Sequence, residues 1–198
     1  MALTRRQVLV RARTTRALVL DVDGVLTDAS LFYGPRGEAL KAFSARDGFA
    51  IKLAQSEGIT VGVLSGRLAP PLKARLADLG IEQLLMIEGS RDKGRDLATL
   101  AKRLKLRAGQ VAYMGDDIPD LAALAAAGLA ACPADAPEEV RSRCHYVCRA
   151  RGGRGAVREI VELLLRARGR WDDLVADWAA GRASATWQAS GSRPSSGN

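Results

Sequence analysis

Three aspartates lie within eight positions of the sequence, in the stretch VLDVDGVLTD over residues 19–28. Asp21, Asp23 and Asp28 follow an apolar run typical of a buried strand, where like charges repel and lose hydration. A second acidic motif, GDDIPD over residues 115–120, follows another apolar run. Carboxylates from two neighbouring strands repel unless a cation lies between them, and hard oxygen ligands suit Mg²⁺. The pattern therefore predicts carboxylate chemistry with a bound metal ion.

Two further groups suit phosphate chemistry: Ser65 in the motif LSGR, and Lys93 in GSRDKG. Each motif also has a purely structural interpretation. An Asp-Gly pair is ordinary turn chemistry, GDDIPD fits a loop with an Asp N-cap, Ser65 can cap a helix, and Lys93 can be a solvated helix residue. The order of the motifs and their placement at strand ends, taken together, favour a catalytic site.

These groups need a scaffold that brings strand ends together. Short aliphatic runs alternate with amphipathic segments, which predicts an α/β fold with a Rossmann-like, doubly wound parallel sheet covered by helices on both faces. In such a fold ligands bind outside the carboxyl ends of the strands, so Asp21, Ser65 and the GDD motif should meet at one crevice. The expected strands are Ala17–Leu20, Thr60–Leu64 and Gln110–Met114, with weaker candidates at Leu129–Ala131 and Tyr146–Cys148; the expected helices are Gly48–Ser56, Pro70–Leu79, Arg91–Leu104, Pro119–Ala126 and Gly155–Arg168.

One segment breaks the alternation of strand and helix. Leu31–Tyr33, the turn GPRG and Glu38–Phe43 predict a small β-hairpin inserted between the first strand and the helix that follows it. We assign residues 1–15 to a basic N-terminal extension, 16–169 to the main α/β domain and 170–198 to a C-terminal tail. In that tail WDDLVADWAA predicts a short helix, and the small, polar remainder is expected to be disordered.

The net charge of +8 is uneven along the chain. Residues 1–16 hold five arginines and no acid, and residues 141–170 hold nine arginines against two glutamates, whereas residues 17–140 carry 14 basic and 17 acidic groups. With only 5% aromatic residues and no basic stripe across the fold, the composition argues against nucleic acid as the ligand and favours an anionic small molecule.

Three cysteines and a single histidine narrow the chemistry further. An odd number of cysteines is expected to stay reduced, and the spacing of CHYVC does not match a zinc site. A lone histidine disfavours Ser-His-Asp and Cys-His mechanisms, which leaves carboxylates. No apolar stretch approaches the ~20 residues of a membrane span, and the first residues lack a signal-peptide pattern, so we expect a cytoplasmic protein and no membrane partner.

The motifs DVDGVLTD, LSGR, Lys93 and GDDIPD resemble the four-motif set of haloacid dehalogenase-like (HAD) phosphatases. The hairpin, together with ARDGFAIKLAQSEGI, VAYMGDD, ADAPEEV and GGRGAVREIVELLL, is similar to the branch that acts on 3-deoxy-D-manno-octulosonate 8-phosphate (KDO 8-phosphate) in lipopolysaccharide biosynthesis. The resemblance covers residues 16 to 168. It implies a homotetramer in which the hairpins pack together and neighbouring subunits shield each active site from solvent.

The resemblance also implies roles for single residues. Asp21 is the nucleophile that forms an aspartyl-phosphate, and Asp23 is the acid and base. Ser65 and Lys93 face the phosphoryl oxygens. Mg²⁺ is held by the carboxylates of Asp21 and Asp116 and the backbone carbonyl of Asp23. Asp117 and Asp120 do not bind the ion themselves but contact the residues that do.

The substrate follows less directly from the sequence. Arg46, Arg67 and Arg154 are the candidates for binding a sugar-acid carboxylate, because a guanidinium binds a carboxylate with two parallel hydrogen bonds. KDO 8-phosphate is the first choice, and an N-acylneuraminate or deaminated (KDN) 9-phosphate is the alternative. A non-catalytic binding module of the same fold is a further alternative, which the intact Asp21, Asp23, Lys93 and Asp116 disfavour.

Overall fold

The computed structural model describes residues 3–35, 37–67 and 70–182 of the chain. Its strands are β1 (Ala17–Leu20), β2 (Phe32–Gly34), β3 (Gly37–Leu40), β4 (Thr60–Ser65), β5 (Met86–Glu88), β6 (Val111–Met114), β7 (Leu129–Cys132) and β8 (Tyr146–Val147). Its α-helices are α1 (Arg5–Thr14), α2 (Ala45–Ser56), α3 (Pro70–Asp78), α4 (Lys93–Arg103), α5 (Leu121–Ala126), α6 (Glu138–Arg141), α7 (Ala156–Ala167) and α8 (Trp171–Ala179). Short 3-10 turns are η1 (Gln83–Leu85), η2 (Ala108–Gln110) and η3 (Ile118–Asp120).

Within these described ranges, the main sheet has six parallel strands in the order β5-β4-β1-β6-β7-β8. The chain builds outward from β1 through β4 to β5 and then crosses to the other side to form β6, β7 and β8. The order therefore reverses at β1, and this is where a doubly wound sheet opens a crevice at its carboxyl edge. The predicted fold class is confirmed.

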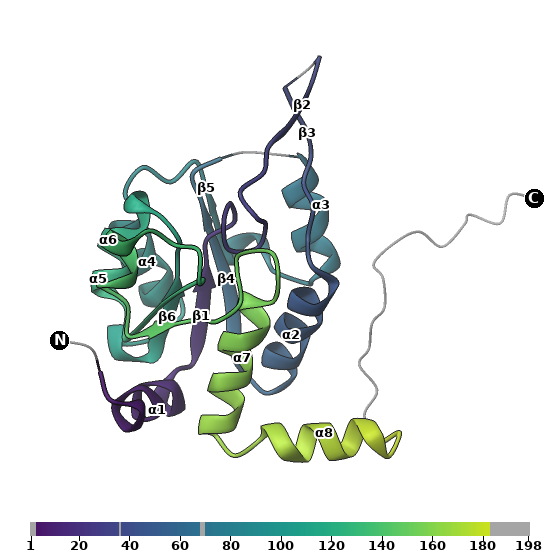
Figure 1. The fold of residues 1–198 in the computed structure, drawn as a ribbon, viewed down its shortest axis with the longest axis vertical. Helices are drawn as coiled ribbons and strands as arrows, with labels where there is room; N and C mark the ends of the chain where they lie inside the picture. The colour runs from purple at the N-terminus through teal and green to yellow at the C-terminus, as the bar shows by residue number, and fades with distance from the viewer. Residues whose placement is uncertain (1–2, 36, 68–69, 183–198) are drawn as a thin grey trace, which may run out of the picture.

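The alternation of side chains along β1 divides the core into two layers. Leu18 and Leu20 pack on the face covered by α1, α2 and α7, whereas Ala17 and Val19 pack on the face covered by α4 and α5. All four residues are buried, as expected for the central strand of a parallel sheet. Figure 1 shows α2 and α7 side by side along one face, with α4 and α5 beyond β6.

The hairpin of β2 and β3 projects from the end of the molecule at which β1 ends (Figure 1). Its side chains Phe32, Tyr33 and Leu40 are 48%, 67% and 65% exposed, so they contribute little to the core of this chain. The predicted hairpin is confirmed, although its second strand ends at Leu40 rather than at Phe43.

Three elements were not predicted from the sequence: α1, β5 and α6. Helix α1 lies in the segment expected to be a basic extension; it buries Val8 and Ala12 against α7. The predicted tail helix is present as α8, which buries Trp171. The prediction of disorder beyond it concerns residues that lie outside the described ranges. No helix in the described part of the chain is long and apolar enough to cross a membrane.

Candidate active site

Three carboxylates meet at the carboxyl edge of the sheet. Asp21 follows β1, Asp116 follows β6, and Asp120 ends the short turn η3. One oxygen of each lies within 4.8 Å of the other two. The sheet order accounts for this convergence, because β1 and β6 are neighbours and end at the same edge.

Lys93 provides positive charge for this cluster from the first turn of α4. Its Nζ atom lies 2.9 Å from Asp21 Oδ1 and 2.7 Å from Asp120 Oδ1. Burial alone would lower the pKa of Lys93, but the charges of Asp21 and Asp120 outweigh it and raise the pKa. The side chain therefore stays an ammonium ion at neutral pH, next to the carboxylate that follows β1.

Asp120 is buried, and both of its oxygens accept hydrogen bonds. Oδ1 accepts from Lys93 and, at 2.6 Å, from the hydroxyl of Tyr113, while Oδ2 accepts from the backbone N–H groups of Asp116 and Asp117 at 3.0 and 3.2 Å. The Asp120 side chain packs closely against the backbone of Gly115, because a Cβ added at Gly115 would lie 2.4 Å from Asp120 Cγ. Asp120 thus fixes the loop that carries Asp116.

Asp117 has a different environment from its neighbours. It is exposed, and its Oδ1 accepts from the backbone N–H of Ile118 at 2.7 Å, which caps η3. The structure places it beside the carboxylate cluster but not within the group of three. Its predicted supporting role stays a prediction.

Asp116 is the carboxylate that best fits a cation. Its Oδ1 atom is buried and has no hydrogen-bond partner among the described residues, which is costly unless a ligand is bound there. Burial, followed by the charges of Asp21 and Asp120, raises the pKa of Asp116 to about 8. Burial and the charge of Asp120 likewise raise the pKa of Asp21 to about 6. A divalent cation would relieve this repulsion, so the donor set suits a hard metal ion.

Asp23 lies at the rim of the site rather than in the cluster. Its side chain is 23% exposed; Oδ1 accepts a hydrogen bond from Lys41, and Oδ2 lies 3.8 Å from Arg67 Nε. The predicted residue Arg67 is therefore brought to the site, with its side chain 49% exposed. Asp23 is held by cations from two separate elements.

Ser65 ends β4 and is buried. Its hydroxyl donates to the carbonyl of Arg67 at 2.9 Å and accepts from the backbone N–H of Arg67 at 3.1 Å. These bonds close the turn after β4, which differs from the helix cap considered for this residue. Contact between its hydroxyl and a phosphoryl group stays a prediction.

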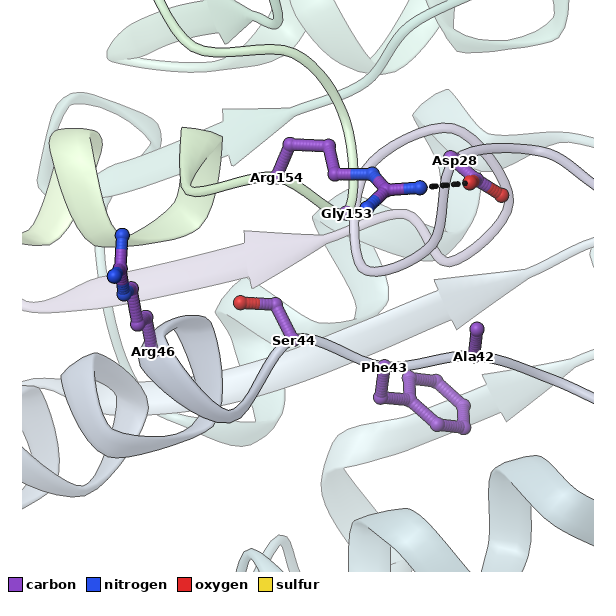
Figure 2. Close-up of a pocket in the computed structure, with 7 residues that line it drawn as sticks. All are labelled: Asp28, Ala42, Phe43, Ser44, Arg46, Gly153 and Arg154. Carbon is purple, nitrogen blue, oxygen red and sulfur yellow. Dashed lines mark hydrogen bonds and ion pairs between the residues drawn. The ribbon is translucent and has the colours of Figure 1, made fainter.

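The other two predicted arginines line a neighbouring cavity of about 300 Å³ (Figure 2). Arg154 points toward Asp28, with Nη2 3.1 Å from Oδ2, while Arg46 lies on the far side of Ser44 in this view. Asp28 is thus the ion-pair partner of Arg154. The arrangement puts two cationic side chains on one open cavity beside the loop that follows β1.

The glycines before Arg154 are needed for close packing. A Cβ added at Gly152 would lie 1.8 Å from the carbonyl oxygen of Gly24, and Gly153 donates its N–H to the carbonyl of Val25 at 2.9 Å. The loop therefore lies directly on the segment that carries the catalytic candidates.

Two polar residues near the site were not found from the sequence. Asp47 is buried in α2, and its carboxylate accepts from the backbone N–H groups of Gly155 and Arg158 at 3.0 and 2.7 Å. It caps α7 from another helix, because Gly155 has no side chain to do so. The second residue is Lys41, the partner of Asp23. An acid directly before the predicted helix Gly48–Ser56 was the one available signal for Asp47, and Lys41 had none.

Comparison with known proteins agrees with this geometry. A haloacid dehalogenase-like hydrolase family matches residues 38–128. The 3-deoxy-D-manno-octulosonate 8-phosphate phosphatase KdsC of Escherichia coli K12 is 42% identical over 166 residues, covering 84% of this chain and 87% of that protein. KdsC of Haemophilus influenzae is 44% identical over 153 residues, covering 77% of this chain and 84% of that protein.

Solved structures of such enzymes share the fold. The 3-deoxy-D-manno-octulosonate 8-phosphate phosphatase of Moraxella catarrhalis, in complex with magnesium, phosphate and KDO, has a TM-score of 0.85 at 32% identity, covering 88% of this chain and 99% of that one. A cobalt-bound Haemophilus influenzae phosphatase has a TM-score of 0.82 at 42% identity, covering 86% and 98%. The similarity thus extends over most of the length of this chain.

Proposed function

The chain belongs to the haloacid dehalogenase-like hydrolases and is a phosphatase of that family, and from that premise we propose that it hydrolyses KDO 8-phosphate to KDO and phosphate with Mg²⁺. The observation that carries the proposal is the group of buried Asp21, half-buried Asp116 and buried Lys93 at the carboxyl edge of the sheet. The identity to KdsC proteins and the KDO complex of the Moraxella catarrhalis enzyme support the choice of substrate.

In the proposed mechanism Asp21 is the nucleophile. Its carboxylate attacks phosphorus, and the bond to the sugar oxygen breaks as Asp23 gives that oxygen a proton. Asp23 then takes a proton from water, which attacks the aspartyl-phosphate and releases phosphate and free Asp21. Lys93 and Ser65 offer donors to the phosphoryl oxygens, where charge accumulates in the transition state. The burial of Asp21 beside a lysine supports this assignment.

The residues that would hold magnesium are the carboxylates of Asp21 and Asp116 and the backbone carbonyl of Asp23. When bound, the ion supplies positive charge that offsets the two carboxylates and the phosphoryl group. Asp120 is less suited to bind it, because each of its oxygens already accepts two hydrogen bonds. Asp120 instead positions Asp116, with Asp117 in a supporting place beside it.

The carboxylate of the sugar acid is assigned to the arginines around the crevice. Arg67 lies next to Asp23, and Arg46 and Arg154 share the cavity of Figure 2. Cations around the crevice suit a substrate that carries a carboxylate as well as a phosphate.

We further propose a homotetramer that forms through the hairpin. Phe32, Tyr33 and Leu40 are large, apolar and exposed on a hairpin that projects from the molecule, which is typical of a surface covered by another chain. Sedimentation is expected to report a tetramer, and a monomer with full activity would contradict this proposal. A cytoplasmic location stays a prediction.

The substrate is tested by comparing kcat/KM for KDO 8-phosphate with that for a nine-carbon sugar-acid 9-phosphate. The extra carbon changes binding in an apolar pocket by only about 1–3 kcal/mol, so the comparison needs purified enzyme and initial rates. We expect the eight-carbon ester to be preferred. A tenfold preference for the nine-carbon ester would overturn the choice, and poor rates on both would point to another phosphate ester.

A further inference from the structure

Lys41 is a buried lysine that joins the hairpin to the rim of the site. It follows β3 on the return from the hairpin, and its side chain is 1% exposed. Its ammonium contacts two carboxylates: it donates to Asp23 Oδ1, and it lies 2.6 Å from Glu38 Oε1. Asp23 belongs to the loop after β1 and Glu38 belongs to β3, so Lys41, which is 18 residues after Asp23, connects these two elements.

Because the Lys41 side chain is buried, it depends on its two carboxylate partners. An ammonium ion removed from water is costly unless it is paired and hydrogen-bonded, and here both partners are carboxylates. The described surroundings give Lys41 no other ion-pair partner. The long side chain is therefore held in one position, and it holds Asp23 in turn.

The contacts also distinguish the two oxygens of Asp23. Oδ1 is taken by Lys41, while Oδ2 has only the longer approach of Arg67, at 3.8 Å, from a side chain that is half exposed. Oδ2 is thus the oxygen left to exchange a proton with a substrate. Asp21 has its own lysine, Lys93, so the two carboxylates are held by separate cations.

We propose that Lys41 is a positioning residue for Asp23, fixing its carboxylate so that Oδ2 faces the leaving group. The inference rests on the proposed role of Asp23 as acid and base. It gives the hairpin a second task, because Glu38 and Lys41 connect the hairpin to a catalytic side chain. Displacement of the base of the hairpin would then reduce catalysis as well as assembly.

The test uses two substrates that differ in their need for an acid. A sugar alcohol leaves only with a proton, whereas 4-nitrophenolate leaves without one. We measure kcat/KM, which reports the steps up to departure of the leaving group and omits the later attack of water. Lys41→Met removes the bridge, and Lys102→Met, at an exposed position on α4, is the matched control.

We expect Lys41→Met to lower kcat/KM for KDO 8-phosphate about tenfold or more, since a positioned acid contributes about 10²–10⁴-fold. With 4-nitrophenyl phosphate the loss should stay below about threefold, and Lys102→Met should change neither. Lys41→Arg, which keeps the charge, should recover part of the selective loss.

Because Lys41→Met leaves Glu38 and Asp23 unpaired, the variant Lys41→Met/Glu38→Gln keeps the test valid if the single variant does not fold. Equal losses on both substrates, or none, would overturn the inference while the proposed function stands. If the wild-type enzyme releases phosphate from neither substrate, both the proposed phosphatase function and the inference about Lys41 are wrong.

Discussion

Gly24 lies where the loop after β1 passes the carboxylate of Asp116, and replacing it tests the geometry of the site. Gly24 has φ +86°, and a Cβ added there would lie 2.0 Å from Asp116 Oδ2 and 2.3 Å from Asp116 Cγ. Real Cβ atoms do not approach other atoms closer than 3.0 Å, so in Gly24→Ala the carboxylate must move by about 1 Å. We expect this variant to lose magnesium affinity and activity together.

The size of the effect follows from two separate costs. A left-handed backbone costs a residue with a Cβ about 1–2 kcal/mol, and overpacking adds about 1–3 kcal/mol. The free energy of unfolding should therefore fall by about 2–5 kcal/mol. A displacement of about 1 Å in a catalytic group costs about 10²-fold in rate, and we expect a loss of that order in phosphate release.

Gly58→Ala is the matched control for this prediction. Gly58 has φ +72°, no described atom lies within 4 Å of an added Cβ, and it precedes β4 at the edge of the sheet away from the site. It isolates the backbone cost of about 1–2 kcal/mol and should leave the rate unchanged. The assays are urea unfolding, magnesium titration and phosphate release. If Gly24→Ala is as active as Gly58→Ala, the carboxylate of Asp116 is not needed where the structure places it.

Three further predictions concern pH, a helix cap and an arginine. The pKa values of Asp21 and Asp116 are raised to about 6 and about 8, so the metal-free folded chain binds more protons than the unfolded chain. The stability of the metal-free protein should therefore fall as pH rises from about 4 to 8, and magnesium should bind more tightly over the same range. Melting temperatures that do not vary with pH or magnesium would contradict this. Asp47→Ala leaves two backbone N–H groups of α7 without their acceptor and should cost about 1–3 kcal/mol in urea unfolding, whereas an unchanged midpoint would rule out the cap. Arg154→Ala breaks an exposed ion pair with Asp28, so stability should change by less than about 1 kcal/mol while KM rises; unchanged kinetics would leave the loop a purely structural role.

The parts of the fold that the sequence predicted are those with a strong local pattern. The strands β1, β4 and β6 are apolar runs that stay buried on both faces, and the alternation of strand and helix predicted that they form a parallel sheet. Strand β5 has only three residues, all half-buried, so its pattern was too short to detect. Helix α1 has four exposed or half-buried arginines and only two buried residues, so its sequence lacks a clear apolar face. The helix is recognised only from its packing against α7 in the structure.

For the site, the sequence predicted the groups that follow strands and not the groups that hold them. Asp21 and Asp116 follow β1 and β6, and the topology alone brings such positions together. The acceptor role of Asp47 toward Gly155 spans 108 residues, and that of Asp23 toward Lys41 spans 18, with no motif connecting the partners. Tertiary contacts of this kind depend on how helices and loops pack and cannot be read from spacing along the chain.

The most direct test of the account is the release of phosphate from KDO 8-phosphate by the purified protein with magnesium, with excess chelator, and by Asp21→Asn with magnesium. Asp21→Asn removes one charge from a crowded cluster, so the variant should fold at least as well as the wild type in the absence of metal. We predict rapid release by the wild type with magnesium, and release near the uncatalysed level in the other two reactions. Full activity with chelator, or more than a few per cent of wild-type activity in Asp21→Asn, would contradict a magnesium-dependent mechanism with Asp21 as the nucleophile.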